Sequence, residues 1–212
     1  MKSTGRMKEK KWFVIGAGGQ ARVVIATARA CGLPDPQACL VDDGSGGQSE
    51  PIRGIPLLTT ESVMGQRGFF FPAVGDNKIR ERLIRQLMDQ GWQAISICHP
   101  TALVEKDVMI GVGTIIAMGA IIQTGARLGN GVIINTGAIV EHDVQVGDCV
   151  HIAPGSVILG EAVIGKCAFI GAGSRILPRV KVGDEAIVGA GSVVRDDVGA
   201  KTTVVGVPAK VV

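Results

Sequence analysis

Residues 128–164 read LGNGVI-INTGAI-VEHDVQ-VGDCVH-IAPGSV-ILGEAV-I, so that every sixth residue is a large aliphatic one. The same register continues without an insertion in both directions and covers sixteen consecutive positions. These positions are Val104, Ile110, Ile116, Ile122, Leu128, Ile134, Val140, Val146, Ile152, Ile158, Ile164, Ile170, Ile176, Val182, Val188 and Val194. Composition alone does not produce an unbroken run of this length, and we interpret it as a structural repeat of six residues.

A second register supports the repeat. Four residues after each aliphatic position the side chain is small or β-branched, from Val108 and Thr114 to Ser192, and glycine often follows the aliphatic residue directly, as at Gly111 and Gly165. These patterns predict a triangular prism in which aliphatic side chains fill the core, small ones lie where the chain bends, and glycine relieves the backbone at the corner. Three units make a coil of about 18 residues, and coils stack at a strand spacing of about 4.8 Å. A β-sandwich would instead show alternation with period two.

The composition agrees with such a core. Glycine accounts for 31 of 212 residues and aromatic residues for only 3%, so aliphatic side chains and regular turns must build the fold. The net charge of +3 is too small to indicate nucleic-acid binding. The basic cluster from Lys2 to Lys11 is expected to be a solvated tail.

The sequence also predicts a compartment. No run approaches the roughly 18 apolar residues that a spanning helix needs, and no apolar stretch follows the basic N-terminus as in a signal peptide. The cysteines are odd in number and lack any C-x-x-C spacing, which favours reduced thiols in a cytoplasmic protein over disulfides or zinc ligands. They are Cys31, Cys39, Cys98, Cys149 and Cys167.

Before the repeat, the chain reads as strands alternating with helices, which predicts a small parallel sheet with helices around it. We expect strands at residues 11–15, 38–41, 68–74 and 93–98. A helical stretch should run to Cys31, and a second helix over 78–90 shows apolar Ile79, Leu83, Leu87 and Met88 at helical spacing. We therefore predict a flexible tail at 1–10, an α/β domain at 11–98, a β-helix at 99–198 and a C-terminal tail at 199–212.

The first strand leads into Gly16-Ala17-Gly18-Gly19-Gln20-Ala21, which fits G-x-G-x-x-A. Glycines allow close backbone approach, and a helix N-terminus offers amides to a phosphate. The 11–98 segment is too short for both halves of a dinucleotide fold, so we predict a half-Rossmann domain that holds one nucleotide diphosphate. A full NAD site and a turn that binds nothing are the alternatives. The predicted substrate-binding residues are Gly16, Gly18, Gly19, Gln20, Asp42, Asp43, Asp76, Asn77 and Asn135.

The histidines give the candidate chemistry. His99 precedes a proline at the domain junction and is interpreted as structural. His142 and His151 are nine residues apart, half of a coil, so they lie on opposite sides of one prism, whereas Asn135 lies nearly one coil from His151 and shares its side. A composite site follows if His142 and Asp143 of one subunit meet Asn135 and His151 of the next. A trimer of prisms supplies the closed ring that this requires.

The repeat resembles the hexapeptide-repeat acyltransferase superfamily, whose left-handed parallel β-helices use acyl-CoA or acyl carrier protein and are typically trimeric. INTGAIVEHD (134–143), VHIAPG (150–155) and the closing GVPAK (206–210) make the chain similar to the NeuD/PglD-type sugar O- and N-acetyltransferases from Lys11 onward. That resemblance implies that His142 is the general base, that Asp143 orients it, and that His151 helps hold the acetyl donor. The family usually has G-G-H where Gln20 stands here, and some members have glutamate at the position of Asp143.

The resemblance further implies an acetyl-CoA-dependent N-acetyltransferase acting on a nucleotide-linked amino sugar, such as a 4-amino-4,6-dideoxy sugar, in surface polysaccharide or glycan biosynthesis. With His151, Gly160 and Ala172 are expected to contact acetyl-CoA, and backbone amides near Gly160 to stabilise the oxyanion. No metal is expected.

Three alternatives stay open. They are O-acetylation of a sialic-acid-like sugar, a non-catalytic β-helix scaffold, and covalent catalysis through Cys149. A carbonic anhydrase would need three zinc-binding histidines, and only two lie in the repeat.

Overall fold

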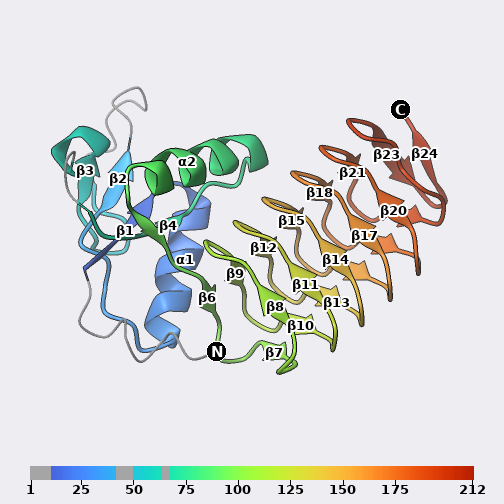
Figure 1. Cartoon of the computed structure of the whole chain (residues 1–212), viewed down its shortest axis with the longest axis horizontal. Helices are drawn as coiled ribbons and strands as arrows, with labels where there is room; N and C mark the ends of the chain where they lie inside the picture. Colours follow the sequence, from blue (N-terminus) through green and yellow to red (C-terminus); the bar gives the residue numbers. More distant parts are fainter. Residues whose placement is uncertain (1–10, 42–49, 64–66) are drawn as a thin grey trace.

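The computed structural model describes residues 11–41, 50–63 and 67–212. A small α/β unit is followed by a long prism of stacked coils (Figure 1). The predicted tail at 1–10 and the acidic pair Asp42 and Asp43 lie outside the described residues. Within the described part of the chain, no helix is long and apolar enough to cross a membrane.

The α/β unit is built on a five-stranded parallel sheet with the order β3-β2-β1-β4-β5. Its elements are β1 (Trp12–Ile15), α1 (Gly19–Ala30), β2 (Cys39–Val41), β3 (Leu57–Thr59), a 3-10 helix (Thr60–Val63), β4 (Phe69–Pro72), α2 (Asn77–Asp89) and β5 (Gln93–Ala94). The apolar strand β1 is central and fully buried, as expected of a strand covered on both faces. The edge strand β3 was not predicted, because it is short and incompletely buried.

The prism is a left-handed parallel β-helix with three faces. The first face contains β7 (Leu103–Val104), β10 (Ile121–Ile122), β13 (Ile139–Val140), β16 (Val157–Ile158), β19 (Arg175–Ile176) and β22 (Val193–Val194). The second contains β8 (Met109–Ile110), β11 (Arg127–Leu128), β14 (Gln145–Val146), β17 (Val163–Ile164) and β20 (Lys181–Val182). The third contains β6 (Ile97–Cys98), β9 (Ile115–Ile116), β12 (Ile133–Ile134), β15 (His151–Ile152), β18 (Phe169–Ile170), β21 (Ile187–Val188), β23 (Thr203–Gly206) and β24 (Ala209–Val211).

The registers confirm the predicted coil length. Neighbouring strands within a face pair residues that are 18 apart, for example Ile121 with Ile139 and Ile139 with Val157. The aliphatic register points inward and is buried, apart from Val104 and Ile110 in the first coil, which has no complete coil before it. The core of the prism is therefore a stack of layers that each contain three aliphatic side chains.

The glycines that directly follow the aliphatic register have a different role from the one expected. They do not have positive φ; instead, neighbouring coils approach closely there. A Cβ atom on Gly165 would lie 2.5 Å from the Asp184 amide nitrogen, and one on Gly171 would lie 2.5 Å from the Ala190 amide nitrogen. Left-handed backbone occurs two residues later, as at Gly113 and Gly131.

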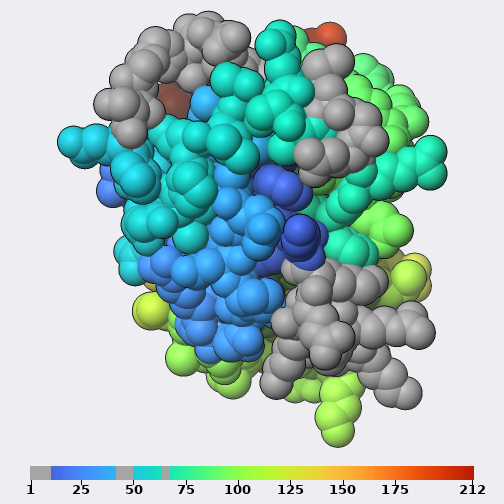
Figure 2. Space-filling view, turned by 90° about the vertical axis from the view of Figure 1, so that its left-hand side faces the viewer, coloured from blue at the N-terminus to red at the C-terminus, as the bar shows by residue number. Residues whose placement is uncertain are grey.

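The α/β unit shares its core with the first coils of the prism. The third-face residues Ile115 and Ile133 are buried in one cluster with Trp12 and Val24 of the α/β unit. Figure 1 shows α1 beside β6, and Figure 2 shows the α/β unit covering one end of the molecule, with the first coils emerging around it. The helix α2 lies along the corner between the second and third faces, where Ile84 packs against Gly113 and Gly131.

Three details differ from the expectations. The predicted strand 93–98 is two strands, because β5 pairs in the α/β sheet and β6 already pairs with β9 of the prism. The predicted C-terminal tail contains β23, which continues the third face, and β24, which pairs with it in antiparallel fashion. The buried stripe of α2 consists of Asn77, Arg80, Ile84 and Leu87, whereas the apolar Ile79 and Met88 are exposed.

Candidate active site

His142 and Asp143 lie in the turn after β13, at the corner between the first and second faces. His142 Nδ1 and Asp143 Oδ2 are 3.0 Å apart. When the Nδ1–H group donates a hydrogen bond to the carboxylate, Nε2 of the neutral ring is unprotonated and can accept a proton from a substrate. The two side chains are 52% and 64% exposed, so this dyad opens on solvent in the single subunit.

Two glycines, one in each neighbouring coil, leave space for the dyad. Gly125 precedes Asp143 by one coil, and Gly160 follows His142 by one coil. A Cβ atom on Gly160 would overlap the imidazole at Nε2, and one on Gly125 would overlap Asp143 Oδ1. Asp107 fixes the Gly125 turn, because its Oδ2 accepts hydrogen bonds from the Gly125 amide at 2.9 Å and the Thr124 hydroxyl at 2.7 Å. The dyad therefore fits only because both neighbouring coils lack a side chain at these positions.

A second polar pair lies on the third face. Asn135 Nδ2 and His151 Nε2 are 3.2 Å apart, as expected from their spacing of nearly one coil. The His151 ring also meets the edge of Phe169, with centroids 5.2 Å apart and an interplanar angle of 86°. Phe169 stands one coil further along the same face, so the imidazole has a fixed orientation.

His151 is held neutral by its surroundings. Burial lowers its pKa to about 4, and the nearby Arg80 guanidinium adds to this effect, while the Gly75 carbonyl opposes it. The buried Nδ1 of His151 makes no hydrogen bond within the described part of the chain. A neutral imidazole at pH 7 can donate or accept a hydrogen bond, but it cannot serve as a cationic anchor.

The two pairs do not form one site within a subunit. His142 and Asp143 border the first and second faces, whereas Asn135 and His151 belong to the third. The residues expected to contact acetyl-CoA are divided in the same way: buried Gly160 follows the first face, and exposed Ala172 follows β18 of the third face. The structure thus separates the halves of the predicted site, as half a coil of spacing requires.

The glycine loop after β1 lies where the strand order of the α/β sheet reverses. β1 and β4 are neighbours, and ligands of open α/β sheets bind at such a switch point. Gly16 has a φ of 108°, and a Cβ atom there would be 2.9 Å from the Ala73 carbonyl oxygen, so the loops after β1 and β4 touch. Open space surrounds Gly18, Gly19 and Gly75. Gln20 lies in the first turn of α1, beside this opening.

Asp76 and Asn77 have structural partners. Asp76 caps α2, since its Oδ1 accepts a hydrogen bond from the Ile79 amide at 2.8 Å. The buried Asn77 side chain donates to the carbonyls of Cys167 and Ala168, both at 2.9 Å. The link from Asn77 to the prism was not predicted from the sequence. Their predicted contacts with a substrate stay predictions.

Sequence reasoning missed Asp107 and Arg80. Asp107 carries a signal that could have found it, because it precedes Gly125 by 18 residues in the coil register that contains Asp143. Arg80 carries none, because nothing in a charged amphipathic helix distinguishes a buried arginine from its solvated neighbours.

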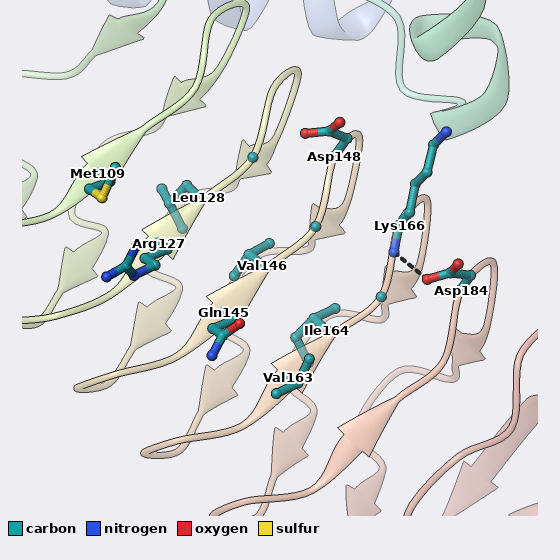
Figure 3. A pocket seen from close by; sticks show the side chains of 13 residues that line it. Met109, Arg127, Leu128, Gln145, Val146, Asp148, Val163, Ile164, Lys166 and Asp184 are labelled. Atoms are coloured by element: carbon teal, nitrogen blue, oxygen red, sulfur yellow. Dashed lines mark hydrogen bonds between the residues drawn. The ribbon is translucent and has the colours of Figure 1, made fainter.

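A further depression of the prism lies away from the histidines. An open depression of about 490 Å³ follows the second face and is lined by residues that include Met109, Arg127, Gln145, Lys166 and Asp184. Figure 3 shows these side chains arranged around the ribbon of the second face. Within the described residues, no group of three or more His, Cys, Asp or Glu side chains could hold a metal ion.

Three family profiles match the chain. The profile "PglD N-terminal domain" matches residues 11–87, "Bacterial transferase hexapeptide (six repeats)" matches 125–160 and 161–196, and "Hexapeptide repeat of succinyl-transferase" matches 102–136. Fold and repeat together define a hexapeptide-repeat acyltransferase that carries a PglD-type α/β domain.

Individual relatives identify the family. A perosamine N-acetyltransferase variant from Caulobacter crescentus, in complex with CoA and GDP-perosamine, is 34% identical with a TM-score of 0.90, covering 96% of this chain and 97% of that one. The PglB acetyltransferase domain of Neisseria gonorrhoeae is 33% identical with a TM-score of 0.89, covering 96% and 100%. The GDP-perosamine N-acetyltransferase of Escherichia coli O157:H7 is 33% identical over 119 residues, 52% of each chain, so the match spans about half of that enzyme. The chain belongs to the PglD-type family of hexapeptide-repeat sugar N-acetyltransferases, and the resemblance seen in its sequence is confirmed.

A methyl group at residue 160 should disable the dyad. Because the Gly160→Ala side chain would occupy the position of His142 Nε2, we expect the imidazole to swing into solvent and kcat for acetyl transfer to fall by about 10²-fold. Gly199→Ala is the matched control, since its Cβ atom would meet only the Thr202 hydroxyl, at 3.2 Å. Steady-state kinetics with wild-type kcat in Gly160→Ala would contradict the packing argument.

His151 should make stability depend on pH. Its pKa is lower in the folded protein than the ordinary 6.5, so the unfolded state binds a proton more readily between pH 6.5 and about 4. The folded state therefore loses stability as the pH falls through this window. In His151→Gln this contribution is absent, and chemical denaturation at pH 7 and 4.5 should show a smaller loss than in the wild type. Equal losses in the two proteins would count against a neutral buried imidazole.

Proposed function

We propose that this enzyme transfers the acetyl group of acetyl-CoA to the amino group of a nucleotide-linked amino sugar, of the 4-amino-4,6-dideoxy type, in surface polysaccharide or glycan biosynthesis. The observation that carries the proposal is the His142–Asp143 dyad, held between Gly125 and Gly160 on a prism joined to a nucleotide-type α/β unit. The relative that binds CoA and GDP-perosamine, similar over nearly the whole chain, supports the same pair of substrates.

The α/β unit would present the acceptor. The loops after β1 and β4 contain glycines, and α1 begins directly after the first of these loops. The N-terminus of a helix favours a bound anion, so a diphosphate could bind there. We propose that Gly16, Gly18, Gly19 and Gln20 bind this part of the nucleotide. The sugar would then extend from the switch point toward the third face, where Asn135 and His151 lie.

Acetyl transfer then follows from the dyad. The sugar amine attacks the thioester carbonyl while His142 Nε2 takes the amine proton, and Asp143 stabilises the imidazolium that forms. Collapse of the tetrahedral intermediate releases the CoA thiolate, which takes the proton from His142 as the amide forms. The Gly160 amide makes no hydrogen bond with the described residues, so it is available to the oxyanion. Cys149 is a poor nucleophile, because burial raises its pKa to about 11.

The outer side of the first face supports a homotrimer. Five of its six outward residues are apolar: Leu103 is 66% exposed, and Ile121, Ile139, Val157 and Val193 are partly exposed, whereas the sixth is the exposed Arg175. An apolar stripe along several coils is typical of a surface that another subunit covers. The dyad borders this face at one corner, and the third face begins at its other corner. Three subunits with their first faces inward therefore bring the dyad of one toward His151 of the next.

Free thiols support the cytoplasmic location that we also propose. All five cysteines are free, and they lie within the described residues. Reduced buried thiols of this kind are typical of a reducing compartment.

A panel of acceptors tests the activity. The protein should release CoA from acetyl-CoA only with a nucleotide sugar that carries a free amine, chosen from GDP-, UDP- and dTDP-linked 4-amino-4,6-dideoxy sugars. His142→Ala should lower kcat by about 10²- to 10⁴-fold, the usual value of a general base. The assay follows the CoA thiol and identifies the product by mass. Acetylation of a hydroxyl on a CMP-linked sialic acid, or no transfer to any amine, would overturn the proposal.

Complementation tests the shared site. Neither His142→Ala nor His151→Ala should be active alone, because each loses one half of every site. Trimers that contain both variants have one interface with an intact His142 and an intact His151, so co-expression should restore part of the activity. Light scattering should give the mass of three chains. Failure of the mixture to exceed the single variants would place the site within one subunit.

A further inference from the structure

Arg80 is completely buried, although arginine is rarely found without solvent contact. It lies in the first turn of α2, on the side facing the prism. Its five N–H groups all find oxygen partners. Nε donates to the Gly131 carbonyl at 2.7 Å. Nη1 donates to the Val74 carbonyl at 2.9 Å and to the Gly75 carbonyl at 3.0 Å. Nη2 donates to Asn77 Oδ1 at 2.7 Å and to the Cys149 carbonyl at 2.8 Å.

Arg80 forms no ion pair with any of the described residues, although the Asp76 carboxylate that caps the same helix favours its charged form. Burial lowers the pKa of Arg80 to about 10, which still leaves it protonated at neutral pH. Burying an unpaired cation is costly, and apolar residues of similar volume often stabilise a core as well as a buried charge does. Stability alone is therefore a poor explanation for an arginine at this point.

The partners of Arg80 belong to three segments that the proposed reaction must bring together. Val74 and Gly75 form the loop after β4, which touches the Gly16 loop at the switch point. Gly131 lies in the turn before β12, and Asn135 directly follows this strand. Cys149 lies two residues before His151. One planar group thus connects the nucleotide-binding loops with both coils that supply the acceptor-facing side chains.

We propose that Arg80 is a positioning residue for acetyl transfer, which fixes the distance between the nucleotide-binding loops and the Asn135–His151 pair. This inference rests on the proposed function, because it assumes an acceptor held at one end by its nucleotide. Such a substrate reaches the dyad at the correct place only if the two halves of the site keep a constant separation. A displacement of about 1 Å at a reacting centre can cost about 10²-fold in rate.

The test compares three variants with the wild type in steady-state kinetics. Arg80→Met keeps the length of the side chain but removes all five hydrogen bonds, and we expect kcat with the nucleotide sugar to fall by about 10- to 100-fold. The KM for acetyl-CoA and the Kd of the free nucleoside diphosphate should stay unchanged, because Arg80 makes no hydrogen bond to the residues proposed to bind either ligand. Arg80→Lys keeps the charge and some donors and should be intermediate.

Lys78→Met is the matched control. Lys78 lies on the same helix and also bridges to the prism, through an ion pair with Glu185 at 2.6 Å, but it is exposed and touches none of the three segments. It should retain the wild-type kcat. A merely structural Arg80 would instead lower the melting temperature and weaken both ligands together, and that result would overturn the inference.

The outcomes separate this inference from the proposed function. No transfer by the wild type to any amine would overturn both. Transfer by the wild type with an equal kcat in Arg80→Met would overturn the positioning role alone. If Arg80→Met does not fold, Arg80→Lys decides: reduced kcat with unchanged nucleotide affinity supports the inference, and wild-type kcat overturns it.

Discussion

The backbone hydrogen bonds between successive coils are the interaction on which the rest of this structure depends. The strands of each coil bond to those of the next coil, as the Ile121 amide does to the Ala138 carbonyl at 2.9 Å and the Ile139 amide to the Ser156 carbonyl at 2.8 Å. This ladder forces residues 18 apart to lie above one another. Close approach of the coils then excludes side chains at places such as Gly165, and it stacks aliphatic residues into a continuous core.

The ladder also gives each corner of the prism a separate role. The corner between the first and second faces holds the dyad in the gap left by Gly125 and Gly160. The helix α2 packs at the corner between the second and third faces, where Gly113 and Gly131 leave space for Ile84. The Gly131 carbonyl at this corner accepts a hydrogen bond from Arg80. Base and acceptor-binding unit are thus attached to one rigid body at different corners, and a second subunit is needed to bring them together.

Much of this arrangement could be predicted from the sequence, because the prism is governed by local periodicity. Counting in steps of six located the buried register, and counting in steps of 18 placed Asn135 beside His151 and separated both from His142. The glycine signal was recognised but misinterpreted, because the sequence does not distinguish close approach of coils from positive φ. The roles of Arg80 and Asn77 could not be predicted, since they depend on how α2 lies against the prism. The exposure of Ile79 has the same origin.

The stacking of the dyad between two glycines restricts how a protein of this design can change in length. A single inserted residue between Gly125 and His142 would bring a residue with a side chain next to Asp143, in the position where Gly125 now leaves space. Only the addition or removal of a whole coil preserves the alignment on both sides. Changes in chain length are therefore expected at the ends of the prism and in turns that bulge outward. The spacing from Gly125 through His142 to Gly160 must stay constant.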